Sequence, residues 1–230
     1  KLAEEGYLAV APDLFWRLEP GIELDPDIEP EMQKAFDLFG KFDQDAGIRD
    51  IEATIHWARE QVASGKVGAV GYCLGGRLAY MTAARTDVNA SVGYYAVGVD
   101  NLLGEKHAIA HPLMLHIAGN DGFVPAEVQQ VMHEGLDDHP KVTLHDYPGM
   151  DHGFATEFGN RRSDEAAELA DSRTAASRHC RHQSRRSTGR TCRATGWGLP
   201  ISSMPSAGRS PSSRMARCAR PWAGWRGRSS

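Results

Sequence analysis

The chain has 230 residues, with 26 Lys and Arg against 30 Asp and Glu and a formal net charge of −4. This average hides a split, because residues 1–177 carry a balance of −16 while residues 178–230 hold 12 Arg and no acidic residue. No run of 18 apolar residues occurs, so we expect no membrane-spanning helix. The acidic part is long enough for one domain with its own core, and its charge argues against a nucleic-acid partner.

The acidic part alternates short apolar runs with helical patterns. In chain order the sequence predicts a strand at Tyr7–Ala11, helices at Glu31–Phe39 and Asp45–Ala63, a strand at Val67–Gly71, a helix at Arg77–Ala84, strands at Ser91–Tyr95 and Leu113–Gly119, a helix at Pro125–Leu136, a strand at Val142–Tyr147 and a helix at Arg162–Ala176. Helix Pro125–Leu136 is expected to turn Val128, Val131 and Met132 inward. This alternation predicts an α/β fold, a mostly parallel sheet with helices on both faces.

The Arg-rich segment 177–230 differs in kind from the predicted domain of residues 1–176. Arg, Ser, Gly, Pro and Trp dominate it, and it has few aliphatic residues with which to build a core. Three interpretations compete: a nucleic-acid-binding arm, a disordered tail, or a reading-frame error in GC-rich coding DNA. We favour the frame error, because the helical pattern of residues 164–176 breaks off where the composition changes and because the segment holds three of the four Cys.

The most informative motif is Gly-Tyr-Cys-Leu-Gly-Gly, residues 71–76, which follows a predicted strand and precedes a predicted helix. This is the strand–turn–helix context of a nucleophile elbow, with Cys73 in the central position. A helix N-terminus favours a thiolate, and the Leu74 N–H would face a developing oxyanion. The alternative is that Cys73 is a small buried apolar residue, but the flanking glycines favour a nucleophile.

A nucleophilic Cys needs a base and a carboxylate that orients it. Asp121 follows the strand Leu113–Gly119, and His152 lies in the Gly-rich loop after Val142–Tyr147. Both positions fall at carboxyl ends of strands, where open α/β sheets bind ligands. Asp121 could instead only form a turn. Asp151 is a rival to Asp121, but its place beside His152 makes it hard to orient toward the ring.

Together with Ala-Pro-Asp-Leu-Phe-Trp-Arg at 11–17 and Ser-Val-Gly-Tyr-Tyr at 91–95, these motifs resemble the dienelactone hydrolase family of α/β-hydrolases from Lys1 to about Ala176. The resemblance implies an ester or lactone hydrolase with Cys73 as nucleophile, His152 as base and Asp121 as its orienting residue. Leu74 would supply a backbone oxyanion donor. Tyr95 would line the substrate site, where Phe36 and Arg162 are further candidates.

The sequence departs from the family pattern where two arginines would hold the substrate carboxylate of a dienelactone. Met32 and Thr156 stand there instead, and neither gives bidentate carboxylate recognition. Arg161 and Arg162 are neighbouring cations that could substitute. The resemblance also implies an upstream strand between Tyr7–Ala11 and Val67–Gly71, with a second oxyanion donor and a Glu that controls the thiolate. Without them we expect the chain to be poorly stable and weakly active.

Cys73 is the lone Cys of the acidic part, which fits a reducing compartment, so we expect a cytoplasmic protein. The sequence shows neither a metal-ligand cluster nor a phosphate-binding Gly-rich loop, so we expect no metal and no cofactor. The expected partner is a small ester or lactone, and a monomer is favoured. The alternative function is a non-catalytic or redox-sensing thiol protein on the same fold, in which Cys73 reacts but turns nothing over.

Overall fold

The computed structural model describes residues 2–157 and 159–179. In chain order the elements are α1 (Glu29–Lys41), α2 (Gln44–Gln61), β1 (Gly68–Tyr72), α3 (Leu74–Arg85), β2 (Ala90–Tyr94), the 3₁₀ helix η1 (Asp100–Ala108), β3 (Leu113–Ala118), α4 (Ala126–Leu136), β4 (Val142–Tyr147) and α5 (Asp164–His179). No helix within these described ranges combines the length and apolar character needed to cross a membrane.

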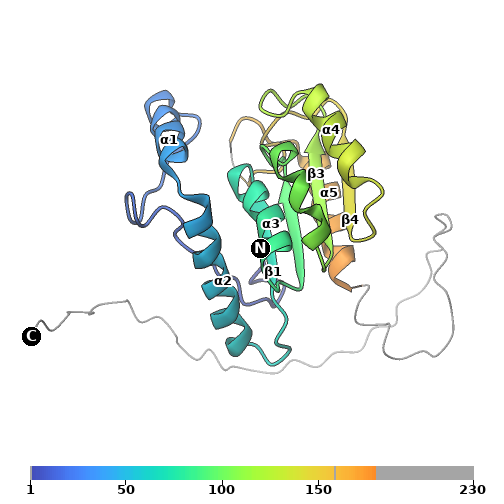
Figure 1. The fold of residues 1–230 in the computed structure, drawn as a ribbon. Helices are drawn as coiled ribbons and strands as arrows, with labels where there is room; N and C mark the ends of the chain where they lie inside the picture. The colour runs from blue at the N-terminus through green and yellow to red at the C-terminus, as the bar shows by residue number, and fades with distance from the viewer. Residues whose placement is uncertain (1, 158, 180–230) are drawn as a thin grey trace, which may run out of the picture. The chain divides into compact units, whose positions relative to one another are not determined.

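The four described strands form one parallel sheet in the order β1-β2-β3-β4 (Figure 1). Their register aligns Gly68 with Ala90, Ser91 with Leu113, and Leu113 with Val142. Each pair of neighbouring strands is joined through a helix, as parallel pairing requires. The predicted α/β fold is confirmed, and the last four predicted strands agree with the observed ones to within one residue at each end.

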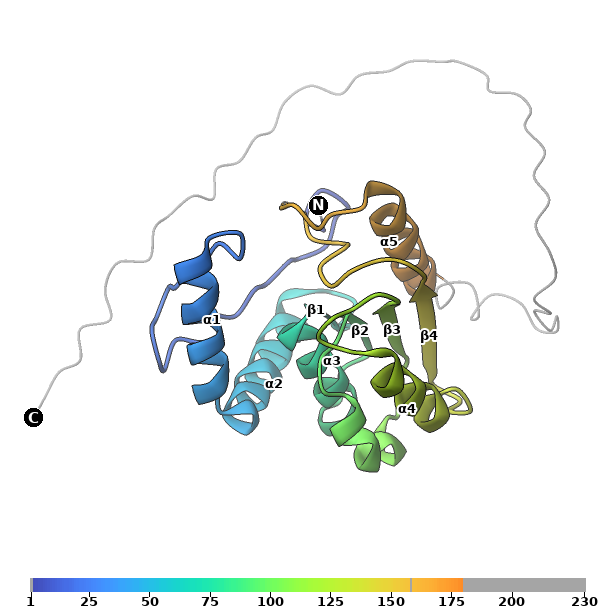
Figure 2. The ribbon, with the colours of Figure 1, turned by 90° about the horizontal axis from the view of Figure 1, so that it is seen from above.

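Helices α2, α3 and α4 cover one face of the sheet and α5 covers the other (Figure 2). Alternating side chains of the strands build a core on each face. Leu113, Leu115 and Ile117 of β3 face α2, α3 and α4, where they join Leu78 and Met132 in the larger cluster. On the other face, Val92 and Tyr94 of β2 pack with Tyr147 of β4 and with Ala166 and Ala170 of α5. All four strands therefore end at one edge of a sheet that is covered on both sides.

The predicted strand at Tyr7–Ala11 is wrong, because this segment forms no strand. The side chains of Tyr7, Leu8 and Val10 are exposed. Strand structure requires a hydrogen-bonded neighbour, and among the described residues no strand lies on the outer side of β1. An apolar run alone therefore does not make a strand when its neighbour in the sheet is missing.

Two further differences concern helices. The sequence pattern missed η1, which runs between β2 and β3. Val131 is exposed rather than turned inward, because the buried stripe of α4 runs through Met132 and Leu136 and leaves Val131 at its flank. Helix α5 continues to His179, past the predicted end at Ala176. The predictions for residues 180–230 lie outside the described residues.

Candidate active site

Cys73 lies in the sharp turn between β1 and α3, as the elbow motif predicts. Its φ of 55° and ψ of −115° lie in a region that non-glycine residues rarely adopt, at a cost on the order of 1–3 kcal/mol. The turn is held on both sides, because Cys73 N–H donates to the Tyr94 carbonyl at 3.0 Å and the Cys73 carbonyl accepts from Arg77 N–H at 3.2 Å. Cys73 is only partly buried and, among the described residues, forms no disulfide.

Glycines let the backbone close this turn. A Cβ added at Gly71 would lie 1.9 Å from the Gly75 carbonyl oxygen, so only glycine fits there. A Cβ at Gly76 would lie 2.8 Å from the Tyr94 carbonyl oxygen, because α3 passes directly over the end of β2. These close approaches bring the first turn of α3 over the sheet and fix the direction of Cys73.

We expect Gly71→Ala to destabilise the protein by at least about 3 kcal/mol, because its methyl group would overlap backbone that cannot move away. The matched control is Gly75→Ala, where an added Cβ meets nothing within 4 Å. That change is expected to be neutral or stabilising by up to about 1 kcal/mol, since Ala favours the helix. Urea unfolding of both variants measures the difference. Equal free energies of unfolding would show that the elbow tolerates a side chain at Gly71.

His152 and Asp121 come from the loops that follow β4 and β3, and both are buried. His152 Nδ1 and Asp121 Oδ2 lie 2.8 Å apart. The other carboxylate oxygen of Asp121 accepts the backbone N–H groups of Phe123, at 2.8 Å, and Val124, at 3.3 Å. Asp121 thus forms the turn and bonds the imidazole with separate oxygens.

The rival carboxylate, Asp151, is engaged elsewhere. Its Oδ1 accepts the backbone N–H of His152 at 2.7 Å, so Asp151 shapes the loop. The loops of Asp121 and His152 are tied together by a 2.8 Å hydrogen bond from Asn120 N–H to the Met150 carbonyl. The carboxylate that contacts the ring comes from the neighbouring strand end.

The protonation of His152 reflects its two partners. Burial opposes the charged form, but hydrogen bonds to Asp121 and to Cys73, together with their charges, outweigh it and raise the pKa of His152 to about 9. Asp121 contacts the ring at Nδ1, and Cys73 is the other group that raises the pKa of His152. Asp121 and Cys73 are therefore the two groups that favour the protonated imidazole.

Tyr95 follows β2 and is only 3% exposed, and its ring centroid lies 4.9 Å from that of His152. Its backbone also adopts a positive φ, 37°. Burial, followed by the charges of Tyr72 and Cys73, raises the pKa of the Tyr95 hydroxyl far above its usual value, so it stays protonated. Among the described residues this hydroxyl has no hydrogen-bond partner, which leaves it available as a donor.

The sequence analysis missed Phe123 as a site residue. Its ring stands edge-on to His152, with 4.7 Å between the centroids. The predicted residue Phe36, on α1, lies 6.2 Å from Phe123 by ring centroids. The only sequence signal for Phe123 is its place two residues after Asp121, within the turn that this carboxylate closes.

Two other predicted residues hold scaffold positions. Leu74 opens α3 and packs partly against the core, so its N–H is one of those at the helix start that lack an intrahelical acceptor. Arg162 donates from Nε to Asp164, at 2.6 Å, and from a terminal nitrogen to the Thr156 carbonyl, at 2.6 Å. The structure thus brings Cys73, His152, Asp121 and Tyr95 together. Phe36 contacts this group through Phe123. Arg162 is instead bound to α5 and to the loop before it.

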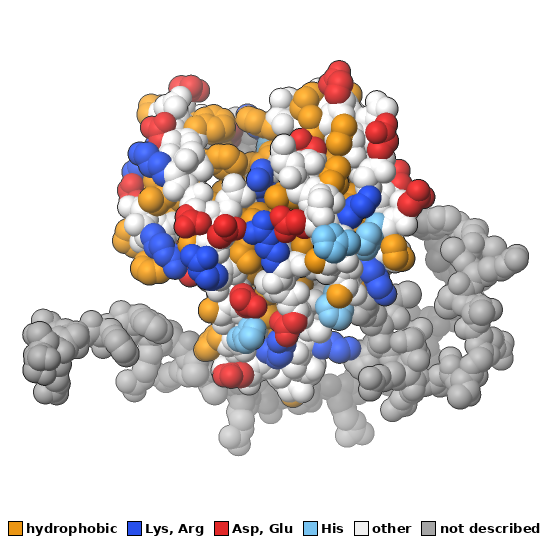
Figure 3. Space-filling view, viewed as in Figure 1, with side chains coloured by type: hydrophobic (Ala, Val, Ile, Leu, Met, Phe, Trp, Pro, Cys, Tyr) orange, Lys and Arg blue, Asp and Glu red, His pale blue; other side chains and the backbone are white. Residues whose placement is uncertain are grey.

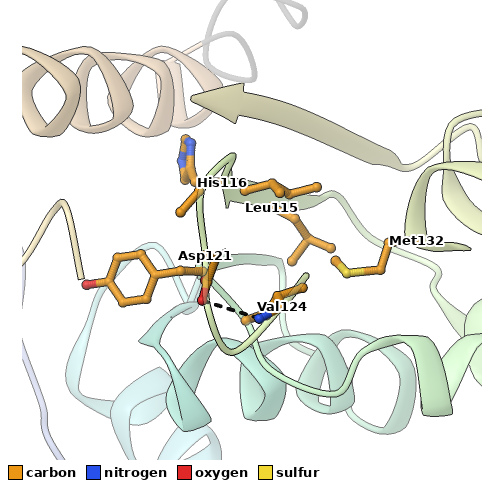
Figure 4. A pocket seen from close by; sticks show the side chains of 9 residues that line it. Leu115, His116, Asp121, Val124 and Met132 are labelled. Carbon is orange, nitrogen blue, oxygen red and sulfur yellow. Dashed lines mark hydrogen bonds between the residues drawn. The ribbon is translucent and has the colours of Figure 1, made fainter. Parts of the chain in front are cut away.

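A small cavity lies beside Asp121. Figure 4 shows its walls, which include Leu115, His116, Val124 and Met132 beside Asp121. Its volume of about 10 Å³ is no more than one water molecule needs. It is a packing gap in the interior, so a substrate has to bind at the outer edge of the site.

His116 lies inside strand β3, so its position does not make it a candidate site residue. Its side chain lies on the face of the sheet that α5 covers. It is fully buried, with Nδ1 2.8 Å from the Tyr147 hydroxyl and Nε2 2.9 Å from the Thr174 hydroxyl. Burial, followed by the charges of His145 and Arg173, lowers the pKa of His116 to about 3. Within residues 2–157 and 159–179, no group of His, Cys, Asp and Glu is arranged to hold a metal ion.

Comparison with known proteins places this chain in a family. Residues 1–177 match the Dienelactone hydrolase family. The chain is 43% identical over 173 residues to a carboxymethylenebutenolidase of Pseudomonas putida, covering 75% of this chain and 73% of that relative. It is 46% identical over 176 residues to a putative carboxymethylenebutenolidase of Azospirillum brasilense, covering 76% of this chain and 75% of the relative.

A solved structure shares the fold. A putative dienelactone hydrolase from Klebsiella pneumoniae superposes with a TM-score of 0.64 at 24% identity, over 76% of each chain. The fold and the strand-end site define an α/β enzyme of the hydrolase type. The chain belongs to the dienelactone hydrolase family.

Proposed function

We propose that this protein hydrolyses a small ester or lactone through a Cys73–His152–Asp121 triad and an acyl-enzyme. The observation that carries the proposal is His152, whose Nδ1 lies 2.8 Å from Asp121 Oδ2 and whose pKa is raised by both Asp121 and Cys73. A thiol protein that only senses oxidation has no need of a buried Asp–His pair beside its Cys. The relatives named carboxymethylenebutenolidases support a lactone as the natural substrate.

The first half of the reaction forms a thioester. Cys73 Sγ, as thiolate, attacks the substrate carbonyl carbon, and the carbonyl electron pair moves to oxygen, where the Leu74 N–H donates to the oxyanion. When the oxyanion collapses, the bond from carbonyl carbon to ester oxygen breaks. The leaving alkoxide takes a proton from His152 Nε2. In a lactone the alcohol stays attached to the acyl group.

The second half of the reaction hydrolyses the thioester and regenerates the free enzyme. His152, now neutral, accepts a proton from water as the water oxygen attacks the thioester carbonyl. Collapse of the intermediate breaks the carbon–sulfur bond and releases the carboxylic acid. Cys73 is then again a thiolate beside protonated His152. Asp121 keeps the proton-carrying Nδ1 in place throughout. Tyr95, whose ring lies 4.9 Å from that of His152 by centroids, is proposed to line the substrate site.

The test is to trap the intermediate. Mixing the protein with p-nitrophenyl acetate and quenching with acid should give an acetyl adduct by intact mass spectrometry, and peptide mapping should place it on Cys73. The chain's other cysteines, Cys180, Cys192 and Cys218, serve as internal controls for non-specific acylation. Turnover in which no adduct appears on Cys73, or in which all four cysteines react equally, would contradict the mechanism.

We also propose the bounds of the catalytic domain, its cellular location and its oligomeric state. The catalytic domain comprises residues 1–176, which is supported by a family match that ends at residue 177, and residues 177–230 do not contribute to the site. The single Cys of the domain supports a cytoplasmic location. Size-exclusion chromatography with light scattering tests the expected monomer.

A further inference from the structure

A group of polar side chains that the proposed mechanism does not use lies inside the domain, between the sheet and α5. On the face seen in Figure 3, acidic and basic side chains are interspersed, so that face presents no extended patch of one charge. In the interior, Tyr94, His116, Tyr147 and Thr174 have exposed fractions of 1%, 0%, 4% and 4%. Burying polar groups costs free energy unless each is hydrogen-bonded, so their partners need an account.

These four side chains form one chain of hydrogen bonds. Thr174 Oγ1 lies 2.8 Å from the Tyr94 hydroxyl and 2.9 Å from His116 Nε2. On its other side, His116 Nδ1 lies 2.8 Å from the Tyr147 hydroxyl. At the opposite end of the chain, the Tyr94 hydroxyl donates to Asp171 Oδ1 at 3.0 Å. A single hydroxyl of α5, on Thr174, thus connects side chains from β2, β3 and β4.

Asp171 gives this chain a direction. A carboxylate only accepts, so the Tyr94 proton points to Asp171 and the Tyr94 oxygen accepts from the Thr174 hydroxyl. The Thr174 oxygen then accepts from His116, whose pKa of about 3, lowered mainly by burial, keeps the imidazole neutral. The single ring proton of His116 therefore sits on Nε2, and Nδ1 accepts from the Tyr147 hydroxyl.

The two tyrosines of the chain also hold the backbone of the active site. The Tyr94 carbonyl accepts the Cys73 N–H at 3.0 Å. The Tyr147 carbonyl accepts N–H groups, at 2.9 and 3.1 Å, from the residues two places before Asp121 and His152. The side chains of Tyr94 and Tyr147 are thus anchored at α5, while their carbonyls anchor the turn and the loops that carry the triad.

We propose that Thr174 is a positioning residue of the triad, which acts through the two tyrosines and His116 to hold three strand ends in catalytic register. Misplacing reacting groups by about 1 Å can cost about a hundredfold in rate. Stability alone does not call for such a chain, because apolar side chains of the same shape can replace a buried hydrogen-bonded pair at little cost. The inference rests on the proposed function, since the register concerned is that of Cys73, His152 and Asp121.

The experiment compares two substitutions in the full chain. Thr174→Val keeps the shape of the side chain and removes the hydroxyl, whereas Thr174→Ser keeps the hydroxyl. Ser172→Ala is the matched control, because Ser172 is an exposed residue of the same helix whose hydroxyl donates to the Leu169 carbonyl at 2.8 Å. The measurements are kcat and KM for p-nitrophenyl acetate, corrected for the folded fraction by circular dichroism, and the His116 tautomer by ¹⁵N NMR.

Thr174→Val should lower the kcat of the folded protein about tenfold to a hundredfold with little change in KM. Thr174→Ser should restore most of the loss, and Ser172→Ala should keep the wild-type value. In the wild type the His116 proton should lie on Nε2, and in Thr174→Val it should shift toward Nδ1, because the acceptor hydroxyl is gone. A helix residue that only stabilised the fold would move neither the corrected kcat nor this tautomer.

A wild-type kcat in Thr174→Val would overturn the inference and leave the proposed function intact, as would a wild-type His116 protonated on Nδ1. If Thr174→Val folds too poorly to assay, Tyr94→Phe breaks the next link of the chain, and an unchanged kcat there would overturn the inference equally. Cys73→Ala assayed alongside separates the two proposals: if it hydrolyses the ester at the wild-type rate, the proposed function itself fails.

Discussion

Replacement of Cys73 by Ala is expected to abolish ester turnover, with a loss in kcat on the order of 10⁶, the size seen when a nucleophile is removed from a catalytic triad. Cys73 stands at the apex of the elbow and is one cause of the raised pKa of His152, and no other group at this turn offers a nucleophile. The fold should persist, because the side chain is small and only partly buried. Thermal unfolding of the variant checks this.

The measurement is initial-rate hydrolysis of p-nitrophenyl acetate by wild type and Cys73→Ala prepared in parallel. Cys73→Ser is the informative companion, because it keeps a nucleophile of the same shape that His152 must now deprotonate. We expect it to retain a small part of the activity and to form an oxygen ester at position 73. A Cys73→Ala variant that turns over at the wild-type rate would show that Cys73 is only a small apolar packing residue and not the nucleophile.

Most of the fold could be predicted from local sequence patterns. The strands β2 and β3 are buried almost throughout, so their apolar runs are short, dense and bounded by turn residues, whereas β4 is buried only at its two ends. Cys73, Asp121 and His152 could be placed because each follows such a strand, and parallel strands bring their carboxyl ends to one edge. The prediction of the site is therefore a consequence of topology.

What could not be predicted depends on contacts between distant segments. The apolar run at Tyr7–Ala11 looks like the other strands, yet it is exposed because pairing is decided by a neighbour and not by composition. The contact of Phe36 with Phe123 joins residues from α1 and from the loop after β3, and neither periodicity nor a motif links them. Arg162 could be named from its position, but only the structure shows that Asp164 and Thr156 bind it.

Asp121→Asn is expected to lower kcat by about 10⁴, because an amide cannot hold the imidazole in the tautomer that the reaction needs. The substitution separates the two roles of this residue. The Asn side-chain oxygen can still accept the N–H groups of Phe123 and Val124, so the turn is kept. Its NH₂ group would then face His152 Nδ1, where the carboxylate oxygen stood. A variant with wild-type kcat would mean that Asp121 only forms the turn.

The same substitution should change how stability depends on pH. The pKa of His152 is raised to about 9 in the folded protein, above its ordinary value of 6.5, so protonated His152 stabilises the fold. That contribution is fully present below the ordinary pKa and is lost as pH rises through the folded one. Because Asp121 is one cause of the rise, the wild type should exceed Asp121→Asn in stability most at about pH 6, with the gap narrowing by about pH 10.

Urea unfolding of wild type and Asp121→Asn across this range, with NMR titration of the His152 ring, measures both quantities. A gap that stays constant with pH would mean that the carboxylate does not stabilise the imidazolium, and a widening gap would reverse the sign of the coupling. The activity and the pH dependence of the stability both report on Oδ2, because the Asn oxygen keeps the bonds that Oδ1 makes. Oδ1 holds the turn at every pH, whereas Oδ2 acts only through the proton on His152. A residue that merely closed a turn would move neither the titration nor kcat.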